Sequence, residues 1–238
     1  MKNLNEIFET TKNISIQAGF DELANYLMNK CVLEINNDEY RIAEIEFYYF
    51  DEKKHNDIHT HRDKCQKKSN VFYFHPAGVD ITFGNEHYYG GILLRSIINL
   101  QTNEYIIGPH KVAYEEFLKC NKNNKLIIEL KEKKLDKKLF FQSCRVNLKI
   151  YKENEKLSKD FIFEPYRYIL NDENLILNLL NFTESHFLAG FLNKYDFESQ
   201  KIIKTIKDKI DYINSDSFLK TQEKEKRNLF IKKIINSN

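Results

Sequence analysis

Two carboxylates and a phenol share one face of a predicted strand in residues 41–50. Successive side chains of an extended strand point to opposite faces, so Glu44, Glu46 and Tyr48 lie together with Ile42. The alternate positions form an apolar face that suits a core: Ala43, Ile45, Phe47 and Tyr49. Glutamates on an isolated strand are usually just solvated. A cleft that holds a flat ring beside a general base would nevertheless need these residue types.

A polar, charged segment at residues 51–70 follows this strand and carries three histidines. We expect a long loop there, which in a compact domain is often functional. His55, His59 and His61 have the spacing His-x3-His-x-His, with Cys65 and His75 nearby, and zinc accepts His and Cys ligands. No second ligand pair has a recognisable finger spacing, so the sequence predicts no metal and no cofactor, with a His-loop metal site as the alternative.

Basic side chains in and beyond this loop are candidates for phosphate contacts. Lys64, Lys67 and Lys68 lie in the loop, and Arg145 and Arg167 are outlying candidates. Acidic residues in the same loop neutralise much of its charge, so a solvated loop is the open alternative.

The composition predicts a folded protein rather than a disordered one. Of the 238 residues, 42% are apolar and 30% are charged, while Pro (3) and Gly (7) are scarce, which favours one compact body. The net charge of +2 neither demands nor excludes nucleic acid. The four cysteines are scattered without CxxC spacing, and the sequence shows no signal peptide or membrane span. We therefore expect a reduced, cytoplasmic, monomeric protein.

Helices follow strands along the chain rather than alternating with them, which predicts the α+β class. A short helix at 21–28, capped by Asp21, precedes the strand at 31–35. Further strands are expected at 40–50, 71–74, 79–83, 90–98, 125–130, 142–150 and 166–170, and a helix at 111–120. After residue 171 only helices are expected, at 175–181, 184–193, 199–213 and 217–236. The predicted division is a domain at 1–170 and a helical C-terminal extension at 171–238 packed on it.

A series of short motifs occurs in a particular order between residues 20 and 170. The motifs are Arg-Ile-x-Glu-x-Glu-x-Tyr at 41–48, a loop histidine, a Pro-Gly turn at 76–78, Leu-Leu-Arg at 93–95, Gly-Pro at 108–109, Ser-x-Arg-Val at 143–146 and Pro-x-Arg-Tyr at 165–168. Each motif alone is weak, but their order resembles the alkyladenine (3-methyladenine) DNA glycosylases.

The resemblance implies a curved antiparallel sheet with flanking helices and a monofunctional DNA glycosylase that acts in base excision repair. Such an enzyme flips a damaged purine out of duplex DNA and hydrolyses its N-glycosidic bond. Carried over by motif, Glu46 would activate the water, Arg95 would help place water and glutamate, and Tyr48 and His59 would stack on the base. His55 and His61 are the alternatives to His59.

The chain departs from the family pattern after Gly78, where a tyrosine-rich strand is expected. Phe83 could fill the hole left by the flipped base. Asp80 lies near the place of the second stacking tyrosine and could hydrogen-bond the base or favour a cationic purine. This departure leaves two alternatives open: a catalytically inactive nucleic-acid-binding protein on the same fold, and the His-loop metal-dependent hydrolase.

Overall fold

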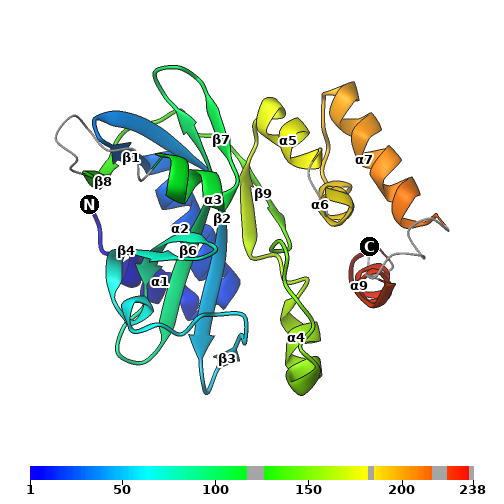
Figure 1. Cartoon of the computed structure of the whole chain (residues 1–238), viewed down its shortest axis with the longest axis horizontal. Coiled ribbons are helices and arrows are strands. Elements are labelled where there is room, and N and C mark those ends of the chain that lie inside the picture. The colour runs from blue at the N-terminus through cyan, green and yellow to red at the C-terminus, as the bar shows by residue number, and fades with distance from the viewer. Residues whose placement is uncertain (117–125, 182–184, 216–223, 236–238) are drawn as a thin grey trace. The chain divides into compact units, whose positions relative to one another are not determined.

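The computed structural model describes residues 1–116, 126–181, 185–215 and 224–235 (Figure 1). By its internal contacts the chain divides into two compact units. The first unit comprises residues 1–139 and 166–170, and the second comprises residues 140–165 and 171–238.

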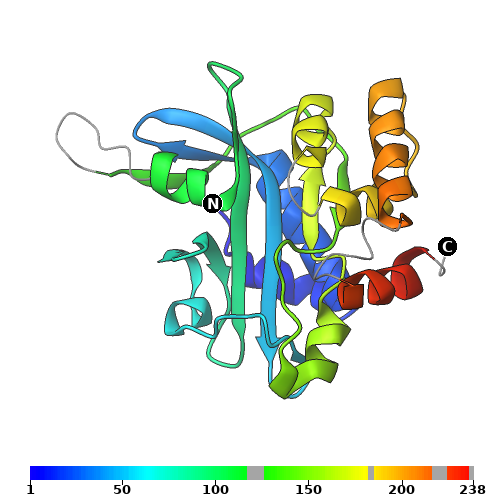
Figure 2. The same ribbon diagram turned by 45° about the vertical axis from the view of Figure 1, so that its right-hand side comes forward.

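The first unit is built on an antiparallel sheet with the strand order β4-β5-β6-β2-β1-β8. In addition, β10 and β3 pair with β2, and β7 pairs with β6. The strands are β1 (Cys31–Ile35), β2 (Asp38–Asp51), β3 (His55–Asn56), β4 (Ser69–His75), β5 (Gly78–Phe83), β6 (Tyr89–Asn99), β7 (Tyr105–Ile107), β8 (Ile128–Glu132) and β10 (Arg167–Leu170). The long strands β2 and β6 run side by side through its centre (Figure 2). This sheet with its flanking helices confirms the predicted α+β class.

Helices of the first unit begin earlier in the chain than expected. They are α1 (Leu4–Lys12), α2 (Ile16–Lys30), the 3₁₀ turn η1 (Lys64–Lys67), α3 (Pro109–Lys111) and the π-helical turn η2 (Val112–Glu116). The expected helix at 21–28 is the second half of α2, and its cap is Ser15, whose hydroxyl accepts a bond from the Ala18 N–H at 3.0 Å. Asp21 instead accepts a bond from the Tyr168 hydroxyl at 2.5 Å. The expected helix at 111–120 lies partly outside the described residues.

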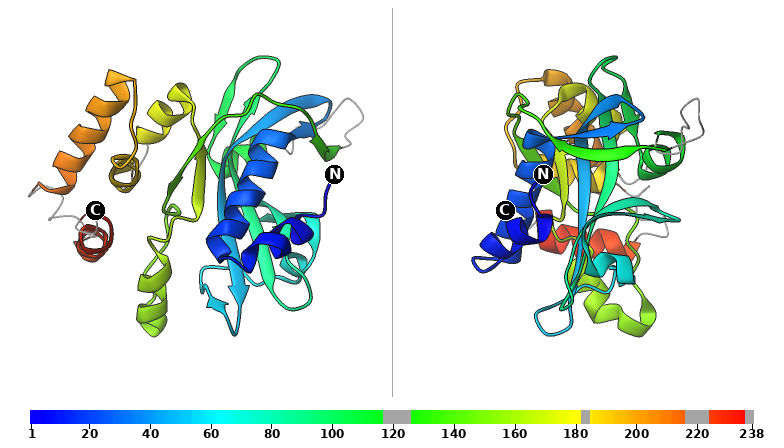
Figure 3. Two further views of the ribbon diagram at one scale, coloured as in Figure 1. Left: turned by 180° about the vertical axis from the view of Figure 1, so that it is seen from behind. Right: turned by 90° about the vertical axis from the view of Figure 1, so that its left-hand side faces the viewer.

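Helices α1 and α2 lie against one face of the sheet (Figure 3), and aromatic rings join both helices to the apolar side chains of that face. The Phe20 ring stacks on Phe47 of β2 with centroids 4.4 Å apart, and the Phe8 ring packs edge-on against Phe83 of β5 at 4.9 Å. Phe83 is fully buried. The expectation that Phe83 is an intercalating wedge is therefore wrong, because its side chain points into the core.

The second unit is largely helical. It contains β9 (Phe140–Ser143), the 3₁₀ turn η3 (Lys152–Asn154), α4 (Glu155–Phe161), α5 (Glu173–Leu180), α6 (Ser185–Leu192), α7 (Gln200–Ile213), α9 (Lys224–Phe230) and the π-helical turn η4 (Ile231–Ile235). Its core includes Phe163, Phe187 and Phe230, whose ring centroids lie 5.0 to 5.3 Å apart. Of the described residues beyond 171, all ordered segments are helical, as expected; the helix predicted at 217–236 falls partly outside them.

The division of the chain differs in one respect from the boundary expected at residue 170. Residues 140–165 belong with 171–238 rather than with the sheet unit. A truncation at residue 170 would consequently cut through a compact unit.

The sequence predicts free thiols and no membrane-spanning helix. Cys31, Cys65 and Cys144 form no disulfide, and Cys120 lies outside the described residues. Among the helices that the structure describes, none combines the length and apolarity needed to cross a bilayer.

Candidate functional site

One face of the sheet carries polar side chains from β5, β2 and β10 in one cross-strand row, which passes through Leu93 of β6. Directly opposite residues of an antiparallel pair lie on the same face. Asp80 of β5 lies opposite Leu93 of β6, Leu93 lies opposite Glu46 of β2, and Glu46 lies opposite Arg167 of β10. Helices α1 and α2 pack on the opposite, apolar face. Asp80, Glu46 and Arg167 therefore lie on the face that these two helices do not cover.

Glu46 lies at the centre of the polar face, between a guanidinium and a phenol. Its Oε1 is 3.4 Å from Nη1 of Arg95, and its Oε2 accepts a bond from the Tyr48 hydroxyl at 3.0 Å. The Glu46 side chain is fully buried, whereas Arg95 is 13% exposed and Tyr48 is half-buried. The structure thus brings together three of the predicted site residues: a carboxylate that is fully buried, and a guanidinium and a phenol that are partly exposed.

A second carboxylate, Glu44, ties Arg95 to β10. Its Oε1 accepts bonds from Nε of Arg95 at 2.9 Å and from Nε and Nη2 of Arg167 at 2.7 Å. The Ser96 hydroxyl donates to Oε2 at 2.5 Å. Burial alone would raise the pKa of Glu44, but Arg167, Arg95 and the Ser96 hydroxyl outweigh it and hold this pKa below the usual value. Conversely, burial lowers the pKa of Arg95 while Glu46 and Glu44 raise it, with a net rise.

The lowered pKa of Glu44 predicts a pH dependence of stability. Its folded pKa lies below the unfolded value of 4.5, so its contribution is fully present above pH 4.5 and is lost as the pH falls through the folded pKa. The Glu44→Gln variant lacks this titration. We expect the difference in free energy of unfolding between the wild type and Glu44→Gln, measured by urea denaturation, to shrink as the pH falls below 4.5. A difference that stays constant down to pH 3 would contradict this assignment.

Asp80 lies on the same face but is held in a network of its own. Its Oδ1 is 2.9 Å from Nε2 of His75, and its Oδ2 accepts a bond from Nε2 of Gln66 at 3.0 Å. The Ala77 N–H donates to Nδ1 of His75 at 3.3 Å, which leaves Nε2 to carry the proton that Asp80 accepts. A Cβ atom on Gly91 would lie 2.5 Å from Oδ2 of Asp80, so only glycine permits this arrangement. Gly91 is the cross-strand neighbour of Tyr48, which places the Asp80 network beside the Glu46 cluster.

The three loop histidines occupy different environments. Nδ1 of His55 lies 2.9 Å from the Tyr49 carbonyl and Nε2 lies 2.9 Å from the Tyr166 hydroxyl, so His55 supports the strand end. His61 packs edge-on against the His75 ring at 4.5 Å, beside Asp80. His59 is buried, and its N–H donates to Oδ1 of Asp57 at 3.1 Å. Of the three loop histidines, His61 is therefore the one whose ring lies beside the polar face. The stacking role of His59 stays a prediction.

The histidines do not converge on a metal-binding arrangement. His55 is bonded to Tyr49 and Tyr166, whereas His75 is bonded to Asp80. Across residues 1–116, 126–181, 185–215 and 224–235, no group of three or more His, Cys, Asp or Glu side chains is placed to hold a metal ion. The His-loop hydrolase therefore has no geometric support in this part of the chain.

The candidate DNA-binding residues divide by exposure. Lys64 and Lys68 are exposed, and Nζ of Lys67 lies 4.8 Å from the Tyr89 ring centre, all on or next to η1. Arg145 is buried and donates to the Phe161 carbonyl at 3.4 Å. Arg167 is buried and bonded to Glu44. The prediction of phosphate contacts is therefore wrong for both arginines, because both guanidinium groups are enclosed within the fold.

Sequence reasoning missed the role of Glu44 and of the residues that hold Asp80. The alternation of β2 already placed Glu44 beside Glu46, and this was the available signal. No local pattern could show that Arg167 reaches Glu44, because 123 residues separate them. Gln66 is likewise brought to Asp80 only by the path of η1 over the sheet.

No family model matches the chain. An uncharacterized protein of Acanthamoeba polyphaga mimivirus is 35% identical over 141 residues, a match that covers 49% of this chain and 60% of that protein. The chain thus spans less than two thirds of the length of this relative, whose description gives no activity.

Proposed function

We propose that the protein is a monofunctional DNA N-glycosylase that hydrolyses the bond between a flipped, modified purine and deoxyribose. One observation carries the proposal: the Glu46 carboxylate lies between the Arg95 guanidinium and the Tyr48 hydroxyl on the polar face of the sheet. The ordered motifs at 41–48, 76–78 and 93–95 supply the residues of this cluster or its flanking strands.

This cluster supplies the groups that hydrolysis of an N-glycosidic bond requires. Glu46 accepts the proton of a water that attacks the sugar, and its negative charge favours the positive charge that develops there as the base leaves. Arg95 pairs with the carboxylate of Glu46 and also donates to the carboxylate of Glu44. Glu44 in turn accepts a bond from Arg167. Arg95 therefore cannot swing away without breaking bonds to two carboxylates.

Recognition of the base rests on ring surfaces and on a polar wall. Tyr48 and His59 stack on the flipped base, and His61 is the alternative on the side of Asp80. Oδ1 of Asp80 is bonded to His75 and Oδ2 is bonded to Gln66. Asp80 therefore forms part of the pocket wall, and both of its oxygens already accept a hydrogen bond from the protein. Tyr73, directly opposite Asp80 and 5.1 Å from the His75 ring, supplies aromatic surface where the second tyrosine is missing.

The rival is a nucleic-acid-binding protein on the same fold that has lost catalysis. The core position of Phe83 favours it, because the residue expected as the wedge is not available. Duplexes that each contain one modified purine, incubated with excess protein and treated with alkali, separate the two functions. We expect strand breaks at one or more lesions. Duplex binding without breaks at any lesion would establish the inactive protein instead.

The biological setting follows from this proposal. The enzyme would act in base excision repair, as a cytoplasmic monomer whose partner is duplex DNA with a damaged base. The lysines next to η1 (Lys64, Lys67 and Lys68) would contact the phosphates.

A further inference from the structure

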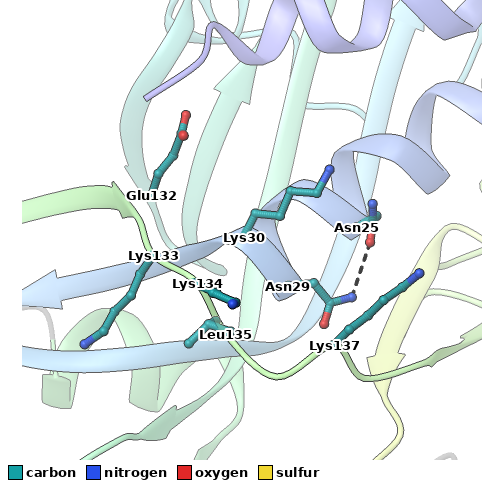
Figure 4. A pocket seen from close by; sticks show the side chains of 8 residues that line it. All are labelled: Asn25, Asn29, Lys30, Glu132, Lys133, Lys134, Leu135 and Lys137. Carbon is teal, nitrogen blue, oxygen red and sulfur yellow. Dashed lines mark hydrogen bonds between the residues drawn. The ribbon is translucent and has the colours of Figure 1, made fainter.

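A hollow of about 560 Å³ lies where the end of α2 meets the segment that follows β8 (Figure 4). It belongs wholly to the first unit. Four lysines, two asparagines, a leucine and one glutamate line it: Asn25, Asn29, Lys30, Glu132, Lys133, Lys134, Leu135 and Lys137. Since α2 packs on the apolar face of the sheet, this hollow is separate from the Glu46 cluster on the polar face.

Hydrogen bonds fix the segment that carries three of the lysines. The Lys133 N–H donates to the Lys30 carbonyl at 2.9 Å. Asn29 exchanges two bonds of 3.0 Å with the main chain of Lys138. Nη2 of Arg41 donates to the Asp136 carbonyl at 2.9 Å and to Oδ1 of Asn29 at 2.7 Å. The segment is held at both ends and in its middle, so the lysines start from a preorganised backbone.

The charges around the hollow are incompletely balanced. Lys133 pairs with Glu39, and Nζ of Lys30 lies 3.8 Å from Glu22. Neither Lys134 nor Lys137 forms an ion pair with a residue that the structure describes. The carboxylate of the lining, Glu132, already accepts bonds from the Tyr26 hydroxyl at 2.7 Å and the Lys2 N–H at 3.1 Å.

The guanidinium of Arg41 is buried beneath these lining residues. It donates to the Met28 carbonyl, the Asp136 carbonyl and the side-chain oxygen of Asn29. Holding several cations around one hollow costs free energy through mutual repulsion, and a bound anion would offset that cost. In Figure 4 the amino groups of Lys30 and Lys137 point to the side of Asn25, whereas that of Lys133 points away.

We propose that this hollow binds a phosphate-bearing anion through Lys30, Lys134 and Lys137, with the Asn25 amide as a further polar contact. The volume of about 560 Å³ lies in the range of small-molecule sites, which is roughly 300 to 1,000 Å³. A phosphate group suits ammonium donors because it accepts several charge-assisted hydrogen bonds. The ligand is either a free polyphosphate-like anion or the phosphate backbone of a nucleic acid.

Calorimetric titration of the full-length protein with inorganic tripolyphosphate tests the proposal. We expect saturable binding by the wild type and at least about tenfold weaker binding by the Lys134→Gln/Lys137→Gln variant. The matched control is Lys204→Gln/Lys207→Gln on the exposed surface of α7, which removes the same charge and should change the affinity by less than about twofold. Thermal unfolding of the three proteins verifies that each is folded.

Titration with an undamaged duplex distinguishes the two sources of phosphate. If the hollow contacts the nucleic-acid backbone, the Lys134→Gln/Lys137→Gln variant will also bind duplex more weakly and with a shallower salt dependence. If it takes a free phosphoanion, duplex binding will equal that of the wild type; both results support the site. Absence of saturable tripolyphosphate binding by the wild type, or equal losses in the two variants, would overturn it. All of these measurements report binding, so none of their outcomes depends on glycosylase activity.

Discussion

Glu46→Gln is expected to abolish base release while leaving duplex binding intact. Glutamine has the size of glutamate: its carbonyl oxygen can still accept a bond from Arg95, and its amide group can donate to the Tyr48 hydroxyl. It cannot take the proton of the attacking water. Loss of a general base typically lowers the rate by about 10² to 10⁴-fold. The measurement is the single-turnover rate of alkali-labile strand breakage, beside an equilibrium binding assay with the same duplex.

The matched control for this prediction is Glu104→Gln, which makes the same change at an exposed position of the first unit. Its rate should equal that of the wild type. If Glu46→Gln retains the wild-type rate, Glu46 is not the general base. If it loses duplex binding as well, its effect is structural.

Arg167→Met is expected to destabilise the first unit by about 3 to 5 kcal/mol. The substitution removes the two nitrogens that lie 2.7 Å from Oε1 of Glu44. The buried carboxylate is left with Arg95 and Ser96 as its named partners, and removal of one member of a buried pair leaves charge that burial makes costly. Urea denaturation at pH 7 measures the loss.

Lys131→Met provides the comparison for Arg167→Met. Lys131 pairs with Glu34 at 2.8 Å, but it is 40% exposed, so its loss should cost no more than about 1 kcal/mol. The double variant Glu44→Leu/Arg167→Met should be more stable than Arg167→Met alone, because it buries no unmatched carboxylate. Equal losses for Arg167→Met and Lys131→Met would show that the buried cluster contributes little to stability.

Local alternation predicted much of the sheet and its two faces. The parity of residues 41–50 placed Glu46 and Tyr48 together, and the structure joins them through a 3.0 Å hydrogen bond. The contact of Glu46 with Arg95 was expected from the motif resemblance rather than from the local pattern. The part of the site that lies within one strand was therefore accessible from local alternation.

The parts that failed depend on long-range packing. Phe83 looks like an exposed wedge next to a turn, but α1 was not expected and its Phe8 ring covers Phe83. Arg167 looks like a free cation in a short motif, but β10 joins β2 and brings Arg167 to Glu44. In both cases a segment distant in the sequence determines whether the side chain is exposed.

A crystal structure of the Glu46→Gln protein with a duplex that contains one modified purine tests the central claim most directly. The proposed function predicts that the purine lies outside the helix, stacked on Tyr48, with its sugar carbon about 3 to 3.5 Å from a water that contacts the substituted side chain at position 46. A purine that stays stacked in the duplex, or a duplex bound away from the polar face of β2, would contradict it.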